Sequence, residues 1–244
     1  MKADVAQQRS LLELAELDGE LARIAHRASH LPEQQAYEQA QADRAVLANR
    51  LAAIGIALED LDTQVSRYES EIDAVRQRAE RDRALLSSVA DAKQLTDLQH
   101  ELETLRRRQD RLEDSLLEVM ERREELQNQQ TAGLAALEDL QAGLASAEQA
   151  RDNALAEIAE SRRQRSSRRE ELTAALKPEL AALYERQRAG GGPGAARLLG
   201  RRCGACRLEI DRGELARIAA ADDDEVLRCP ECGAILLRIE ESGR

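Results

Sequence analysis

Apolar residues follow a heptad rhythm through most of this sequence, in alternating steps of three and four. Helices that carry such a repeat bury one narrow stripe of side chains against each other as a coiled coil. We call the residues of this stripe the apolar seam. It begins with Leu14, Leu17, Leu21, Ile24, Ala28 and Leu31, and resumes in a different phase with Tyr37, Ala40, Leu47, Leu51, Ile54, Leu58, Leu61, Val65, Tyr68, Ile72, Val75 and Ala79. The repeat predicts a mainly α-helical protein.

Two interruptions divide the repeat. Pro32 lacks an N–H and disfavours helical geometry at the residue before it, so we expect a break near residues 30–33. Two serines and Asp91, a residue type that caps helices, predict a turn near residues 87–93. After this turn the seam keeps one register from Leu95 to Ile158. It is interrupted only by polar or small residues, among them Gln109, Arg123, Gln130, Gly133 and Arg151.

The arms on the two sides of the second turn, residues 4–86 and 92–188, are similar in length. A short turn between long amphipathic helices favours antiparallel neighbours. The sequence therefore predicts a long antiparallel coiled-coil hairpin over residues 1–188, compatible with a monomer or a homodimer. A parallel coiled-coil dimer without a hairpin is the alternative.

The composition suits a thin seam rather than a thick core, because aromatic residues are 1% of the chain and charged residues 34%. The net charge of -11 disfavours a general nucleic-acid coat protein, since binding phosphates requires clustered cations. The N-terminus has no continuous apolar stretch typical of a signal peptide, and no stretch approaches the ~18 apolar residues of a membrane span. We therefore expect a cytoplasmic protein whose thiols are reduced.

The most basic part of the chain, which we call the basic neck, covers residues 162–202. Its candidate contacts for nucleic acid or a partner are Arg162, Arg163, Arg165, Arg168, Arg169, Arg201 and Arg202. A local patch of this kind attracts phosphate. The alternative is a solvated helix face whose arginines pair with Glu160, Glu170 and Glu171 or with the acidic first arm.

A glycine-rich segment, residues 189–199, predicts a flexible linker before a C-terminal domain over residues 200–244. That domain holds all four cysteines, Cys203, Cys206, Cys229 and Cys232, spaced C-x2-C-x22-C-x2-C. Two such turns supply four thiolates, the tetrahedral set that Zn²⁺ accepts. We expect one structural zinc ion; disulfides and a rubredoxin-like iron site are the alternatives.

The residues around the cysteines predict a zinc ribbon. Residues 211–225 suggest a short helix, with Asp211 as its N-cap and Glu214 as capping-box partner, followed by an acidic loop. The flanking residues 207–210, 225–229 and 234–240 suggest short β-strands. Gly233 is expected to allow a tight turn that brings its N–H to a sulfur. So small a domain depends on its metal for folding.

These motifs resemble those of the bacterial C4-type zinc-ribbon proteins with an N-terminal coiled-coil hairpin. The resemblance is carried mainly by LYERQR (183–188), CGACRLEI (203–210) and CPECGAILLR (229–238), and more weakly by residues 92–105 and 112–122. It implies a helical hairpin with a zinc ribbon at its open end. Members of the family are described as nucleic-acid-binding or protein-interaction factors, and some bind messenger RNA or an RpoN-type sigma factor.

Two functions follow from the sequence. The first is a non-enzymatic adaptor that docks a protein partner through its hairpin and ribbon. The second is an RNA- or DNA-binding regulator that uses the basic neck. An enzyme is not expected, because the four-cysteine site leaves no open metal position and no nucleophile–base pair stands out.

Overall fold

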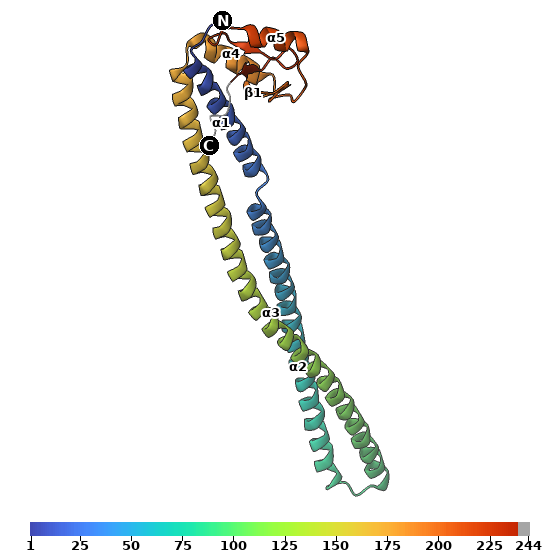
Figure 1. The fold of residues 1–244 in the computed structure, drawn as a ribbon. Helices are drawn as coiled ribbons and strands as arrows, with labels where there is room; N and C mark the ends of the chain where they lie inside the picture. Colours follow the sequence, from blue (N-terminus) through green and yellow to red (C-terminus); the bar gives the residue numbers. More distant parts are fainter. Residues whose placement is uncertain (239–244) are drawn as a thin grey trace. The chain divides into compact units, whose positions relative to one another are not determined.

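The computed structural model describes residues 1–238 and shows a helical hairpin followed by a small sheet (Figure 1). The helices are α1 (Val5–Ser29), α2 (Pro32–Leu86), α3 (Ala92–Ala175), α4 (Pro178–Ala189) and α5 (Arg212–Ala220). The strands are β1 (Ala195–Leu199), β2 (Arg202–Cys203), β3 (Leu227–Arg228) and β4 (Ile235–Leu237). Among the described residues, no helix contains a stretch long and apolar enough to cross a bilayer. The mainly α-helical class and the hairpin are confirmed.

The helix ends follow the expected local chemistry. Helix α1 ends at Ser29 and α2 begins at Pro32, where the missing N–H of proline costs no helical hydrogen bond. Helix α2 ends at Leu86, and the Oδ1 atom of Asp91 accepts a hydrogen bond from the Lys93 N–H at 3.1 Å where α3 begins. The turn between α2 and α3 thus makes them antiparallel neighbours.

The chain divides into two compact units, residues 34–149 and residues 1–33 together with those from 150 onward. Within residues 34–149, the seams of α2 and α3 pack against each other. Ile54 lies in one buried cluster with Leu126, and Ala79 lies in another with Leu105. All four residues are predicted seam positions.

Two exceptions to the apolar seam have partners across it. A Cβ atom added to Gly133 would lie 2.6 Å from Cδ2 of Leu51, so the glycine leaves room for the leucine. Arg123 forms an ion pair with Asp62 of α2. A small residue and a charged residue are therefore accommodated by specific neighbours on the facing helix.

In the other unit, α1 packs on the C-terminal part of α3 and on α4. Leu31 and Ile158 lie in one buried cluster. A larger cluster contains Leu11 and Leu14, both fully buried, and Tyr184 of α4. Its other members are Ala3, Leu172, Leu176, Leu180, Leu183, Ala195, Ile235 and Leu237. The helices and the sheet of this unit therefore share one core.

The strands form one sheet in the order β2-β1-β4-β3. Strand β1 runs parallel to β4, with Ala195 opposite Ile235, and antiparallel to β2. Residues 195–199 lie within the expected flexible linker, but they form β1 because β4 offers a buried edge for pairing. The expected flexible linker is therefore corrected at residues 195–199, which form a strand in the same compact unit as α1 and α4.

The expected strands around the cysteines are only partly formed. Residues 207–210 contain no strand beyond a single bridge between Arg202 and Glu209. The expected strand 225–229 shortens to Leu227–Arg228, and 234–240 shortens to Ile235–Leu237 within the described residues; residues 239–240 lie outside them. Helix α5 begins as expected, with Asp211 accepting hydrogen bonds from the N–H groups of Gly213 and Glu214.

The N-terminus pairs with the acidic loop after α5. The Lys2 ammonium lies 3.0 Å from Asp222 and 2.9 Å from Asp224, and these contacts raise its pKa. The backbone continues the contact, because the Ala3 N–H donates to the Asp224 carbonyl at 2.7 Å. Gln8 donates to the carbonyl of Asp223 at 3.0 Å. The acidic loop thus holds the first residues of the chain against the ribbon.

Tyr184 lies beneath the start of β1. A Cβ atom on Gly194 would lie 2.5 Å from the ring carbon Cε2 of Tyr184, and the Gly194 carbonyl accepts a hydrogen bond from the Ile235 N–H at 3.0 Å. The backbone is therefore fixed on one side by the sheet and on the other by the ring. Only glycine leaves enough space at position 194.

Replacing Gly194 with alanine should lower the free energy of unfolding by about 1–3 kcal/mol, because the added methyl group overpacks the contact with Tyr184. Denaturant unfolding followed by circular dichroism measures this. Gly192→Ala is the matched control, since no atom lies within 4 Å of its added Cβ, and it should change stability by no more than about 0.5 kcal/mol. Equal stability of the two variants would contradict the packing of Tyr184 under β1.

Candidate metal centre and basic neck

The four cysteines converge on one point of the ribbon. All four sulfurs lie within 4.8 Å of one another. The Sγ atoms of Cys203 and Cys232 are 3.8 Å apart, and those of Cys206 and Cys229 are 3.9 Å apart. A tetrahedral ion bound about 2.3 Å from each sulfur places the sulfurs about 3.8 Å apart. The expected ligand set therefore fits one zinc ion, and none of the cysteines forms a disulfide.

Two equivalent turns position the sulfurs. In the first, the carbonyl of Cys203 accepts the Arg207 N–H at 2.8 Å; in the second, the carbonyl of Cys229 accepts the Gly233 N–H at 2.9 Å. Arg207 and Gly233 both have positive φ, 63° and 75°. Arg207 thus adopts a left-handed conformation that glycine adopts more readily, which explains how the first turn forms without a glycine.

The backbone also donates to the sulfurs. The Ala205 N–H lies 3.4 Å from Sγ of Cys203, and the N–H groups of Leu208 and Ala234 donate to the sulfurs of Cys206 and Cys232. The expectation for Gly233 is therefore corrected: its N–H binds a carbonyl, and the next residue reaches the sulfur. The positive φ of Gly233 is what directs the Ala234 N–H toward the sulfur.

The thiols differ in how readily they ionise. Burial raises the pKa of Cys203 to about 12 and raises the pKa of Cys232, whereas the Leu208 N–H lowers the pKa of Cys206. Zinc binds cysteines as thiolates, so a cation at this point offsets the cost of charging the buried sulfurs. Cys203 and Cys229 also belong to the apolar core of the ribbon, which links metal binding to folding.

Most arginines of the basic neck are engaged within the chain. Arg165 lies 2.8 Å from Glu20 of α1, and Arg168 lies 2.8 Å from Glu13. Arg163 pairs with Glu160, Arg169 with Asp18, and Arg201 with Glu209. Arg162 and Arg202 are exposed and form no ion pair within residues 1–238. The neck is thus mainly a set of ion pairs with the acidic first arm.

Asp18 of α1 is the centre of a polar network. Its carboxylate is only 10% exposed. It accepts hydrogen bonds from Arg169 at 2.6 Å and from the Tyr184 hydroxyl at 2.7 Å, and it pairs with Arg188 at 3.0 Å. Burial and the hydrogen bond to Asp18 raise the pKa of Tyr184, and the Asp18 contact raises that of Arg169. The network joins α1, α3 and α4 beside the ribbon.

The LYERQR segment, which the sequence marks only through its resemblance, supplies much of this junction. Tyr184 and Arg188 reach Asp18, and Glu185 pairs with Arg169. The amide of Gln187 lies against the second cysteine turn; oriented to satisfy both neighbours, it donates to the Gly233 carbonyl at 3.0 Å and accepts from Arg228 at 2.9 Å. The sequence signal that could have revealed this junction is a tyrosine and a glutamine placed between charged residues.

Native mass spectrometry of the purified chain should show one bound zinc ion, and Cys203→Ser should lose it, because the serine hydroxyl is a poor replacement for a buried thiolate. Glu231→Gln is the matched control, since Glu231 is exposed between Cys229 and Cys232 but supplies no sulfur. Retention of zinc by the serine variant, or its loss in the glutamine variant, would contradict the four-sulfur site.

Known proteins share both parts of the chain. The profile of the CT398-like coiled coil hairpin domain matches residues 14–192, and that of the C4-type zinc ribbon domain matches residues 202–236. An uncharacterized protein of Mycobacterium tuberculosis, Rv2229c, is 70% identical over 241 residues, or 98% of each chain. The Mycobacterium leprae protein ML1638 is 56% identical over 225 residues, or 92% of this chain and 97% of that one.

Solved structures agree with the fold. A Mycobacterium smegmatis protein, 60% identical, superposes with a TM-score of 0.84 over 98% of this chain and all of the other. CT398 from Chlamydia trachomatis has a TM-score of 0.69 at 20% identity, covering 96% of this chain and 98% of its own, and so shares the fold. With the expected resemblance thus confirmed, the chain belongs to the family of CT398-like coiled-coil hairpin proteins that carry a C4-type zinc ribbon.

Proposed function

We propose that the protein is a non-enzymatic adaptor of the cytoplasm that docks a protein partner through its hairpin and ribbon, with one structural zinc ion in the ribbon. The observation that carries this proposal is the exposure of large apolar side chains along the hairpin. The seam between α2 and α3 explains the buried apolar residues of residues 34–149. It leaves the exposed ones without a role inside the chain.

The exposed apolar side chains occur on both helices. On α3, Leu117 is 58% exposed and Met120 47%, and they lie one helical turn apart. On α2, Val46 is 70% exposed and Ile56 64%. Apolar and methionine side chains on the outside of a helix are typical of surfaces that bind another protein.

The metal site favours a structural role over catalysis. Four sulfur ligands fill the tetrahedral coordination of zinc and leave no position for water or a substrate. Cys203 and Cys229 are also buried, 1% and 3% exposed, within the core of the ribbon. A metal in this position would hold the ribbon together rather than react.

The ion pairs of the basic neck weigh against the nucleic-acid alternative. A phosphate that binds Arg165, Arg168 or Arg169 must compete with a carboxylate already within hydrogen-bond distance. Arginines that are neutralised in the free protein release fewer counterions on binding and so contribute less affinity. Protein docking remains the function that the surface supports best.

Affinity capture from cells with the tagged, zinc-loaded, nuclease-treated full chain tests the proposal. The double variant Leu117→Ser, Met120→Ser should weaken partner capture by about tenfold or more, because it removes the adjacent apolar contacts. The matched control is Glu118→Ser, Glu121→Ser, which changes exposed residues of the same turns and should retain capture. Melting temperatures of both variants confirm that the hairpin is intact.

Capture of no stable protein by the wild type, or equal weakening by both double variants, would contradict docking through this face. The nucleic-acid alternative predicts a different result. It requires salt-sensitive binding of mixed RNA or DNA that disappears when the neck arginines 162, 163, 165, 168 and 169 are replaced by serine.

A further inference from the structure

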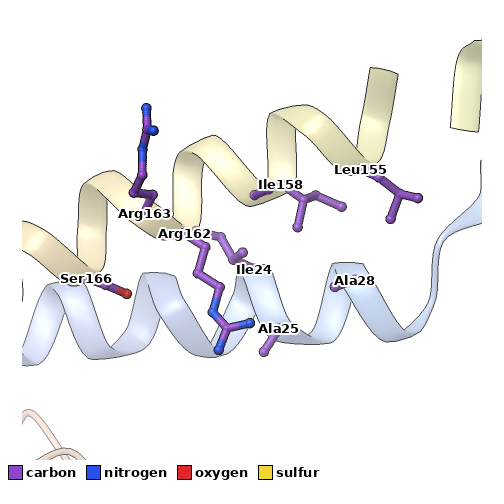
Figure 2. Close-up of a pocket in the computed structure, with 9 residues that line it drawn as sticks. Ile24, Ala25, Ala28, Leu155, Ile158, Arg162, Arg163 and Ser166 are labelled. Atoms are coloured by element: carbon purple, nitrogen blue, oxygen red, sulfur yellow. The ribbon is translucent and has the colours of Figure 1, made fainter. Parts of the chain in front are cut away.

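An apolar groove runs between α1 and α3 in the unit that contains the ribbon (Figure 2). Its volume is about 440 Å³, within the range of about 300–1,000 Å³ that is usual for binding pockets. The residues that form it include Ile24, Ala25 and Ala28 of α1 and Leu155, Ile158 and Arg162 of α3. None of the residues lining the groove is acidic.

The groove exists because the side chains along its edge are small. Ile158 is buried in the seam with 8% exposure and forms part of the floor. Ala25 and Ala28 are exposed and too short to cover it, and Leu155 is left 42% exposed at the edge. Helices α1 and α3 thus border an open apolar groove, which is the kind of surface on which an amphipathic helix packs.

Two neighbouring arginines differ in their relation to the groove. Figure 2 shows the Arg162 side chain reaching from α3 toward α1 beside Ala25, whereas Arg163 points away from α1. Arg163 is paired with Glu160. Arg162 is exposed and, within residues 1–238, has no hydrogen-bond or ion-pair partner. The groove therefore has one unpaired guanidinium at its polar end.

We propose that this groove binds an acidic amphipathic helix of the protein partner, with apolar side chains over Leu155 and Ile158 and a carboxylate on Arg162. The inference rests on the proposed function and names the chemistry of the docked segment. Leu155 and Arg162 are seven positions apart, which corresponds to about 10.5 Å along the helix axis. The docked helix therefore carries its acidic residue about two turns from its first apolar anchor.

The absence of acidic residues from the lining explains why the occupant is acidic. A guanidinium beside an apolar surface binds a carboxylate in two parallel hydrogen bonds, which adds both affinity and orientation. A basic segment would place its charge beside Arg162 and be repelled. An uncharged segment would gain only the apolar contact.

A displayed library of helical peptides, each about 20 residues long, tests the proposal when it is selected on the zinc-loaded full chain. Recovered peptides should carry an acidic residue about seven positions from a large apolar residue. Their affinity, measured by fluorescence anisotropy, should fall by at least about tenfold with Arg162→Glu, since a charged hydrogen bond is lost and repulsion replaces it.

Arg163→Glu is the matched control, because it makes the same charge change one residue away, where the side chain borders the groove but points away from α1; it should alter affinity by no more than about twofold. Ala28→Trp fills the groove from an exposed position and should abolish peptide binding while the circular dichroism spectrum and melting temperature stay unchanged. Together, these results would distinguish peptide binding in the groove from nonspecific electrostatic attraction of the peptide to the basic neck.

Several outcomes would overturn the inference. Among them are selection of no peptide, selection of peptides without the acidic residue, equal effects of the two arginine variants, and a wild-type dimer that Ala28→Trp converts to a monomer. Binding of oleate that depends on Arg162, with no peptide recovered, would identify a lipid site instead and also overturn it. If Ala28→Trp still captures the cellular partner, the groove proposal fails while the adaptor function stands.

Discussion

The junction between the helices and the ribbon depends on the contacts of the Asp18 carboxylate. A carboxylate only 10% exposed is costly unless it is paired, and Asp18 binds Arg169, Arg188 and the Tyr184 hydroxyl. Arg169 comes from α3 and the other two partners from α4, so neither helix can move away from α1 without leaving a buried charge unsatisfied. The ring of Tyr184 extends this constraint to Gly194 and thus to the first strand of the ribbon.

This arrangement changes the meaning of the basic charge in the neck. Arginines clustered in sequence look like a surface for phosphate, but Arg165 and Arg168 are paired with glutamates of α1. Their partners are about 150 positions earlier in the chain, as the pair of Arg168 with Glu13 illustrates. Arg162 is different because the α1 residues that line the groove with it, Ile24, Ala25 and Ala28, offer no carboxylate.

Much of the fold follows from local rules that the sequence carries. Heptad spacing determines the seam, Pro32 and Asp91 determine helix ends, and two C-x-x-C turns determine the sulfur site. Strand β1 could not be predicted in this way, because residues 195–199 directly follow a glycine-rich segment and form a strand only when β4 supplies an edge. The pairing of Lys2 with the acidic loop is likewise a contact between opposite ends of the chain, which no local pattern records.

The shared core of α1, α4 and the sheet predicts that the ribbon and this end of the hairpin unfold together. Hydrogen exchange of the zinc-loaded and the chelated protein measures this directly. Removing zinc should speed exchange in residues 5–18 and 178–189 as well as in the ribbon, while residues 54–79 of α2 stay protected. Faster exchange confined to residues 202–237, with α1 unchanged, would contradict a single cooperative unit.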